Sequence, residues 1–150
     1  MVPVEVIKDC KIFKMFPDNI IEEIASVGLK LKYKANQMIF NIDEPAENLS
    51  ILCEGRVQIL TTKRTQLIPF RIVYPGDAFA LSSVITGRFV AAAKAMEDCV
   101  VCAIPTDELN KILEKDYKGG FLFMKHIATL LSNRLVRMHD QLDITGPGYA

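Results

Sequence analysis

The sequence predicts a mainly β protein, a barrel or jelly roll that carries helices at both of its ends. Between residues 29 and 105 the chain contains many short apolar segments, and turn residues bound each of them. One helical pattern precedes this region and two more follow it. Because helices do not separate the strands from one another, a barrel or jelly roll is favoured over a parallel sheet.

The length and composition are those of one globular domain. The chain has 150 residues, half of them hydrophobic, and it balances 18 basic residues against 18 acidic ones. A protein whose main partner is DNA usually has a basic surplus, so we expect no direct DNA binding. No apolar run approaches the roughly 20 residues that cross a bilayer, and the N-terminus does not have the pattern of a signal peptide. We therefore expect a cytoplasmic protein that does not enter a membrane.

The first clear helix is predicted over residues 16–28, FPDNIIEEIASVG. Asn19 and Glu22, three residues apart, have the spacing of a capping box, and Gly28 stands where a C-terminal glycine belongs. The apolar face of this helix would consist of Ile20, Ile21 and Ile24. Residues 1–28 are therefore expected to form an N-terminal helical segment.

Seven segments have the composition of strands. They are LKLKYK (29–34), MIF (38–40), LSILCE (49–54), RVQILT (56–61), QLIPFRIVY (66–74), VAAAKAM (90–96) and CVVCAI (99–104). The first alternates apolar and basic residues, as a half-buried strand does. Glu54 and Gly55 predict a tight hairpin, and residues 74–77, YPGD, predict a turn.

Two helices are predicted over residues 106–142. Thr106 is expected to cap the first of them, TDELNKILEK, and Gly119 with Gly120 to break it. Beyond the break, apolar residues recur at spacings of three and four: Phe121, Met124, Ala128, Leu131, Leu135, Met138 and Leu142. This heptad seam predicts a helix that pairs with a second copy of itself. The alternative is one amphipathic helix that lies on its own domain.

A second apolar stripe runs beside the seam in the first half of the long helix only. It consists of Phe123, Ile127 and Leu130, and it gives way to Arg134, Arg137 and Gln141. We therefore expect the start of this helix to pack on the barrel. The last residues, 143–150, read DITGPGYA and predict a loose tail.

Residues 75–95, PGDAFALSSVITGRFVAAAKA, are laid out like a phosphate-binding cassette. A turn is followed by a short segment with small residues, and then by a run of small residues that enters a strand. Together with the helices and the β region, this order of elements resembles the cyclic nucleotide-binding domain. That domain is the sensor module of catabolite-activator-type transcription factors, kinase regulatory subunits and gated channels.

The resemblance covers roughly residues 10–142 and implies a double-stranded β-helix (jelly-roll) barrel. It implies a β-roll core over residues 29–105, an N-terminal helix, a short cassette helix and a long C-terminal dimerisation helix. Residues 35–60, ANQMIFNIDEPAENLSILCEGRVQIL, have the family's pattern of glycine-bounded strands, and Gly55 matches a family glycine. Asn36 and Asp43 stand where two other glycines are usual, and both residue types tolerate left-handed backbone.

The cassette departs from the family at the two residues that bind the nucleotide. Gly76 and Asp77 match the family turn, but Ala80 and Leu81 align with its Gly-Glu pair and Phe89 aligns with its arginine. In the family, the glutamate binds a ribose hydroxyl and the arginine binds the cyclic phosphate. Each such hydrogen bond is worth roughly 1.5–3 kcal/mol. Losing both therefore predicts cyclic AMP binding weaker by about two to four decades.

The candidate ligand-binding residues are those of the cassette: Gly76, Phe79, Ala80, Leu81, Ser82, Ser83, Arg88, Phe89, Val90 and Ala91. Arg88 is the obvious replacement for the missing arginine, but a residue beside an inward-facing Phe89 should face water, so a solvated loop arginine is favoured. The apolar members either fill the pocket and close it, which is favoured, or form a pocket for a more apolar ligand. Amides near Ser82 and Ser83 offer a place for a small anion.

The remaining chemical groups predict no enzyme and no metal site. Cys99 and Cys102 have the spacing of a redox motif. Side chains three residues apart in a strand point to opposite faces, so two buried structural thiols are favoured. His126 and His139 have no ligand partners at suitable spacing. No catalytic triad, carboxylate pair or phosphate loop is present.

We therefore expect a non-catalytic regulatory module that senses a small ligand, a cyclic nucleotide or another, or serves as a dimeric signalling module. Occupancy of the pocket would act on a hinge near Gly119 and Gly120 and change the register of the paired helices. One alternative is a ligand-free scaffolding domain. Another is a partner subunit of a transcription regulator, because no helix-turn-helix pattern follows Leu142. No cofactor is expected beyond the small ligand.

Overall fold

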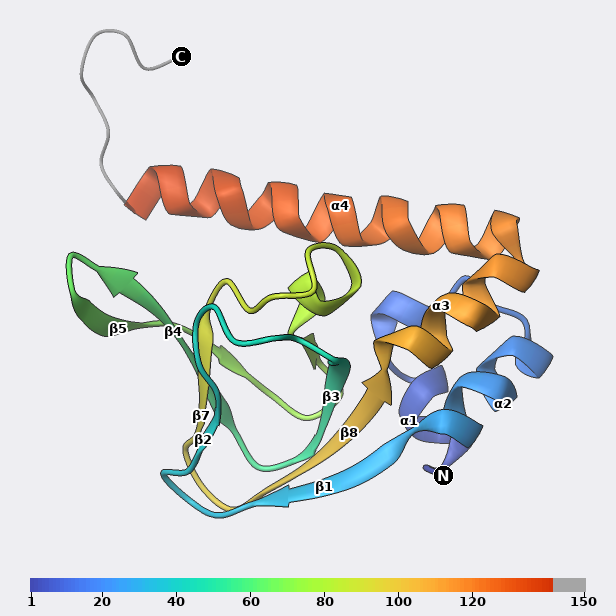
Figure 1. Cartoon of the computed structure of the whole chain (residues 1–150), viewed down its shortest axis with the longest axis horizontal. Coiled ribbons are helices and arrows are strands. Elements are labelled where there is room, and N and C mark those ends of the chain that lie inside the picture. Colours follow the sequence, from blue (N-terminus) through green and yellow to red (C-terminus); the bar gives the residue numbers. More distant parts are fainter. Residues whose placement is uncertain (142–150) are drawn as a thin grey trace, which may run out of the picture.

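The computed structural model describes residues 1–141 and contains eight strands in two antiparallel sheets, which confirms the predicted mainly β jelly roll. The first sheet has the order β1-β8-β3-β6 and the second the order β2-β7-β4-β5. The strands are β1 (Leu29–Tyr33), β2 (Met38–Phe40), β3 (Asn48–Glu54), β4 (Val57–Lys63), β5 (Gln66–Val73), β6 (Ala78–Phe79), β7 (Ala92–Ala95) and β8 (Cys99–Pro105). The sheets form a roll with the long helix across one side (Figure 1).

Helices lie at one end of the roll and along it (Figure 1). They are α1 (Val4–Lys8), α2 (Asp18–Val27), α3 (Thr106–Lys115) and α4 (Tyr117–Gln141), with 3-10 turns η1 (Lys11–Phe13) and η2 (Leu81–Val84). Leu142 and the predicted tail, residues 143–150, lie outside the described residues. No helix within residues 1–141 is long and apolar enough to cross a membrane.

Two predicted helix caps and one predicted helix break are wrong. Helix α2 starts at Asp18 after Pro17, which has no side-chain cap, so Asn19 lies within the first turn and forms no capping box. The Thr106 hydroxyl does not cap α3; it donates to the Glu47 carbonyl at 2.9 Å and ties the helix to the chain before β3.

The helix break is at Asp116 and not at Gly119 and Gly120, which lie in the first turn of α4. Asp116 has φ −133° and ψ 79°, outside the helical region. Its Oδ1 atom accepts the Gly119 amide hydrogen at 3.1 Å and so caps α4. Both glycines continue the helix because this cap starts it upstream of them.

Strand β1 is more exposed than its alternating pattern predicts. Leu29 and Leu31 are 50% and 36% exposed. Within the first sheet β1 lies at the edge and pairs only with β8, from Leu29 opposite Ala103 to Tyr33 opposite Cys99. The expectation of a half-buried strand was therefore wrong for these two leucines.

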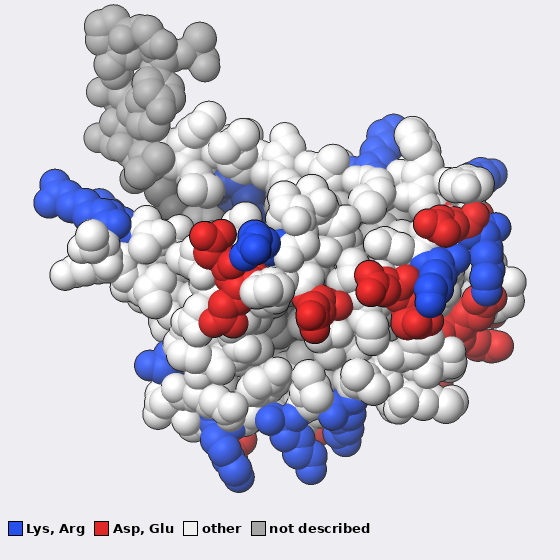
Figure 2. Space-filling view, in the orientation of Figure 1, with Lys and Arg blue, Asp and Glu red and all other residues white. Residues whose placement is uncertain are grey.

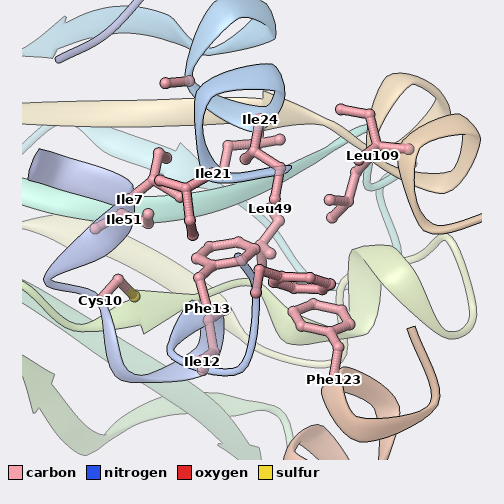
Figure 3. Packing of buried hydrophobic residues seen from close by; sticks show 14 of the residues in the cluster. Ile7, Cys10, Ile12, Phe13, Ile21, Ile24, Leu49, Ile51, Leu109 and Phe123 are labelled. Atoms are coloured by element: carbon pink, nitrogen blue, oxygen red, sulfur yellow. The ribbon is translucent and has the colours of Figure 1, made fainter. Parts of the chain in front are cut away.

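Two apolar clusters hold the fold together. The helical cluster packs α1, α2, α3 and the start of α4 against the first sheet, and its members include Ile7, Phe13, Ile24, Leu49, Leu109 and Phe123 (Figure 3). The roll cluster lies between the sheets and includes Phe40, Leu52, Val57, Val73, Phe79 and Val101. Phe123 and Ile127 are 0% and 1% exposed, and Phe123 stacks on Phe13 with ring centroids 5.5 Å apart. The start of α4 packs on the domain as predicted.

The buried thiols follow the two clusters. Cys99 belongs to the roll cluster and Cys102 to the helical cluster, so they face opposite sides of β8 as predicted. All four cysteines are free. Burial raises the pKa of Cys10 to about 11 and that of Cys102 to about 12, and both thiols are neutral at physiological pH. They act as small apolar side chains.

Candidate functional site

The cassette begins with the turn after β5. The Gly76 amide donates to the Leu52 carbonyl at 2.8 Å, and the Asp77 amide donates to Tyr74 at 3.0 Å. Strand β6 then pairs with β3, and Ala80 precedes η2 with φ 63° and ψ 40°. This left-handed conformation costs an L-residue roughly 1–2 kcal/mol. Ala80 therefore adopts the backbone of the glycine with which the sequence resemblance aligns it.

Asn36 and Asp43, the other two residues at family glycine positions, are also left-handed, with φ of 70° and 71°. This confirms the prediction for both positions. The polar side chains of Asn and Asp tolerate this region better than most others. The departure from glycine therefore leaves the path of the roll intact.

A cavity of about 420 Å³ lies between the second sheet, the cassette and α4. Its volume is within the range of small-molecule sites, about 300–1,000 Å³. Of the ten candidate residues, the structure places six around it: Ala80, Leu81, Ser82, Phe89, Val90 and Ala91. Gly76, Phe79, Ser83 and Arg88 do not line it.

The favoured expectation that apolar residues close the pocket is wrong. Phe89 stacks on Phe40 with ring centroids 3.8 Å apart and planes 8° from parallel. Phe79 is fully buried in the roll cluster, with its ring centroid 6.2 Å from that of Phe40. Phe40 and Phe89 form part of the cavity wall, and the space beside them is open.

Arg88 points away from the cavity. Its Nη1 atom donates to the Asp43 carbonyl at 2.6 Å, and its backbone forms a bridge to Pro45. Arg88 is exposed, which agrees with its interpretation as a solvated loop arginine. Its guanidinium holds the loop before β3 against the cassette.

The backbone of η2 is largely occupied by its own hydrogen bonds. The Ser83 amide donates to the Ala80 carbonyl at 3.1 Å, and the Ser82 carbonyl accepts the amides of Ile85, Thr86 and Gly87. The Ser83 hydroxyl is buried and forms no hydrogen bond with any described residue. Ser82 lines the cavity, but the Ser83 amide is not available to an anion.

The cavity is also lined by two arginines that lie outside the cassette, Arg71 and Arg134. Burial is the main cause that lowers the pKa of Arg71 to about 10, and the charge of Arg134 is the second cause. The pKa of Arg134 is also lowered, mainly by burial and next by the charge of Arg137. Both guanidinium groups remain charged at neutral pH.

One of these arginines could have been found from the sequence. Arg134 continues the stripe of Phe123, Ile127 and Leu130 at helical spacing, so it belongs to the face that packs on the domain. Arg71 gives no such signal. The register of β4 with β5 shifts between Ile59 and Leu60, and this bulge allows the neighbours Phe70 and Arg71 both to line the cavity.

The predicted seam divides into two parts on α4. Phe121 and Met124 are 68% and 39% exposed, and Ala128 is exposed too. Leu131, Leu135 and Met138 line the cavity, although Leu131 and Leu135 keep 37% and 54% of their surface exposed. The second part of the seam therefore faces both the cavity and the surface.

The charges on the surface are mixed. Figure 2 shows acidic side chains across the middle of one face and basic side chains along its lower edge, over β1. Four ion pairs are found among the described residues, and all are exposed, such as Arg56 with Glu97 at 3.3 Å. Among the side chains that the structure describes, no group of three or more His, Cys, Asp or Glu residues is arranged to hold a metal ion.

Solved structures have the same fold. A candidate cyclic nucleotide-binding protein of Geobacter metallireducens aligns over 90% of this chain and 99% of its own, with a TM-score of 0.77 and 24% identity. The catabolite activator protein of Thermus thermophilus aligns over 89% of this chain and 62% of its own, with a TM-score of 0.74 and 21% identity.

Sequence comparison identifies the family. An anaerobic regulatory protein of Pasteurella multocida is 27% identical over 121 residues, which are 79% of this chain; the match spans only 40% of that relative. The sequence profile of the cyclic nucleotide-binding domain matches residues 30–116, more than half of the chain. The chain therefore belongs to the cyclic nucleotide-binding domain family.

Proposed function

We propose that this chain is a non-catalytic regulatory sensor whose input is a small molecule in the cavity and whose output is the pairing of α4 with a second copy. One observation carries the proposal. Leu131, Leu135 and Met138 line the cavity and also belong to the heptad seam. A molecule in the cavity would therefore contact the side chains that form the contact between helices. A cytoplasmic location fits this role.

The ligand is not expected to be cyclic AMP at ordinary affinity. Leu81 and Phe89 line the cavity where family members carry a glutamate and an arginine, and both offer only hydrocarbon. Arg88 is held by the Asp43 carbonyl. A ribose hydroxyl and a cyclic phosphate placed against Leu81 and Phe89 would lose water without gaining partners there.

The homodimer is supported by the apolar residues that α4 exposes. Phe121, Met124, Leu131 and Leu135 are each more than a third exposed, and they lie on one helical face. A second α4 would cover this face, since its own seam has the same spacing. The predicted partner is therefore another copy of this chain.

The switch requires that the ligand bind two arrangements of α4 with different affinity. Helix α4 begins at the Asp116 cap, and its first turns are fixed by Phe123 and Ile127 in the helical cluster. Its C-terminal half meets the cavity. We expect this half to shift on ligand binding, and the hinge to lie between the buried start of α4 and Leu131 instead of at Gly119 and Gly120.

The proposal is tested by combining a ligand screen with sedimentation. Thermal shift with cyclic AMP, cyclic GMP and a panel of metabolites identifies a ligand, and sedimentation velocity then measures the dimer with and without it. We expect a ligand that raises the melting temperature to change the dimer dissociation constant. If ligands bind without changing the dimer, the proposed output is wrong. If no molecule of the panel binds, the scaffolding alternative is favoured.

A further inference from the structure

The cavity has one distinctive chemical feature, a pair of arginines in an apolar wall. Among the described residues that line the cavity, Arg71 and Arg134 are charged and none carries a carboxylate. They come from different elements, β5 and α4. The rest of the wall includes Phe40, Phe70, Phe89, Leu131, Leu135 and Met138, with hydroxyl groups from Thr61, Ser82 and Thr86.

Neither guanidinium has a counter-ion within the described part of the chain. The four ion pairs found there involve other residues, and the hydrogen bonds formed there do not include either side chain. The charge of Asp77 favours the charged form of both arginines. The Oδ2 atom of Asp77, however, accepts a hydrogen bond from the Tyr74 amide at 3.2 Å.

Holding these charges in place without a partner is unfavourable. Both arginines are partly buried, and burial is the main reason that their pKa values are lowered. The next cause is the charge of Arg134 for Arg71, and the charge of Arg137 for Arg134. A single anion that contacts both guanidinium groups would offset the cost of burying them, since arginine forms bidentate hydrogen bonds with carboxylate and phosphate groups.

We propose that the cavity takes an amphipathic organic anion, whose carboxylate, phosphate or sulfonate head binds Arg71 and Arg134 and whose apolar body lies against Phe89 and Leu135. This inference rests on the proposed function and specifies its ligand class. The head group would not occupy the cassette, where Phe89 replaces the family arginine. The cation pair supplies charge from β5 and α4 instead.

Such a ligand would connect the roll to the half of α4 that the proposed switch moves. Its head group would join β5 to α4 through two guanidinium groups. Its body would contact Leu135 and Met138, which belong to the seam. A neutral ligand of the same shape would fill the space but would make no such link.

A matched pair of fluorescent probes tests the ligand class. 8-Anilino-1-naphthalenesulfonate (ANS) is an apolar aromatic anion, and N-phenyl-1-naphthylamine is the same molecule without the sulfonate. Both are titrated into the full chain and into the single variants Arg71→Gln and Arg134→Gln. We expect wild type to bind ANS at least about 10-fold more tightly than the neutral probe, because two charge-assisted hydrogen-bonding groups meet the head.

Each glutamine variant should lose most of this preference while its affinity for the neutral probe stays within about 3-fold, since the apolar wall is unchanged. Arg56→Gln and Arg64→Gln are the matched controls, because they remove the same charge at exposed residues outside the cavity. They should keep the preference. Thermal unfolding without a probe should show both cavity variants at least as stable as wild type, since an unpaired buried charge has been removed.

The outcomes separate the ligand class from the proposed sensor. If the neutral probe binds wild type as tightly as ANS, or if the preference survives both cavity substitutions, the anion site is wrong while the cavity still binds a small molecule. If neither probe binds wild type, the anion site is wrong, and the screen with cyclic nucleotides and metabolites decides the sensor function separately.

Discussion

At the scale of single residues, the path of the roll depends on a few left-handed positions whose surroundings differ. Gly55 and Gly76 share a φ of 94°. At Gly55 a Cβ atom would lie 2.6 Å from the Asp98 carbonyl oxygen and 2.6 Å from Cys99 Sγ, whereas at Gly76 it would meet no atom within 4 Å. Comparing alanine variants at these two positions therefore separates the cost of backbone strain from the cost of steric overlap.

Gly55→Ala should destabilise the protein more than Gly76→Ala. Both changes place an alanine in the left-handed region, which costs roughly 1–2 kcal/mol. Gly55→Ala also overpacks the turn between β3 and β4 against Asp98 and Cys99, which adds about 1–3 kcal/mol. Urea unfolding of the two variants measures the difference. Equal free energies of unfolding would show that the Gly55 site relaxes without cost.

The buried thiols predict how stability changes at alkaline pH. Cys10 and Cys102 ionise near pH 9 when unfolded, but burial raises their pKa in the folded state to about 11 and about 12. Above pH 9 the unfolded state therefore releases protons that the folded state keeps, and the free energy of unfolding falls with pH. The slope is about 1.4 kcal/mol per pH unit for each thiol until its folded pKa is reached.

The measurement compares urea unfolding at pH 8.5 and pH 10.5 in wild type and in Cys10→Ala with Cys102→Ala. Lysines and tyrosines also titrate in this window, so the difference between the two slopes is the relevant quantity. The double variant should lose less stability across the window than wild type. Parallel slopes would mean that these thiols are not shielded from water.

Leu81 and Phe89 determine how tightly this chain should bind cyclic AMP. Wild type should bind cyclic AMP weakly, and Leu81→Glu with Phe89→Arg should bind it more tightly than either single variant, because the two groups would hold different parts of one ligand. Losing the stack of Phe89 on Phe40 should lower the stability of the unbound double variant. Calorimetric titration of the four proteins decides it. Micromolar or tighter binding by wild type would contradict the assignment.

At the scale of elements, the strands and the two ends of the chain were predictable because their patterns are long or are bounded by strong turns. All seven predicted strands are present, and Glu54 and Gly55 join β3 to β4 as predicted. The elements that were missed are short: β6 has two residues, η1 three and α1 five. Such segments are too short for periodicity to appear, and tertiary contacts decide them.

Helix ends were the least predictable part of the elements, because several groups compete to satisfy the same amides. The start of α4 shows this. Gly119 and Gly120 have low helix propensity, which predicts a break, but the Asp116 carboxylate stabilises the first turn. Close packing also favours Gly119, since a Cβ atom there would lie 2.7 Å from the Phe16 ring.

Asp116→Ala should therefore weaken the start of α4 and destabilise the domain by about 1 kcal/mol. Asp116→Asn is the control, because an asparagine side chain also accepts a hydrogen bond from the Gly119 amide and should keep most of the stability. Chemical unfolding monitored by circular dichroism gives both values. If the alanine and asparagine variants are equally destabilised, the cap does not stabilise α4.

At the scale of the whole molecule, the family and the general position of the site were accessible from the sequence, but the chemistry of the cavity was not. Six of the ten candidate residues surround the cavity because the cassette and its neighbouring strand are continuous in sequence. The direction of Arg88, the row of stacked rings and the arginine on β5 depend on contacts between distant segments. Side chains normally alternate between the two faces of a strand, but the bulge at Phe70 breaks this alternation in β5. The face on which Arg71 lies therefore cannot be inferred from its neighbours.

We propose that the apolar seam of α4 forms a homodimer beside the cavity. Sedimentation velocity would compare three proteins: wild type, Leu131→Asp with Leu135→Asp, and a control, Asn133→Asp with Val136→Asp. The control adds the same charge to exposed residues outside the seam. We predict that wild type and the control sediment as dimers and that the seam variant sediments as a folded monomer. A wild-type monomer, or a seam variant that remains dimeric, would contradict the account.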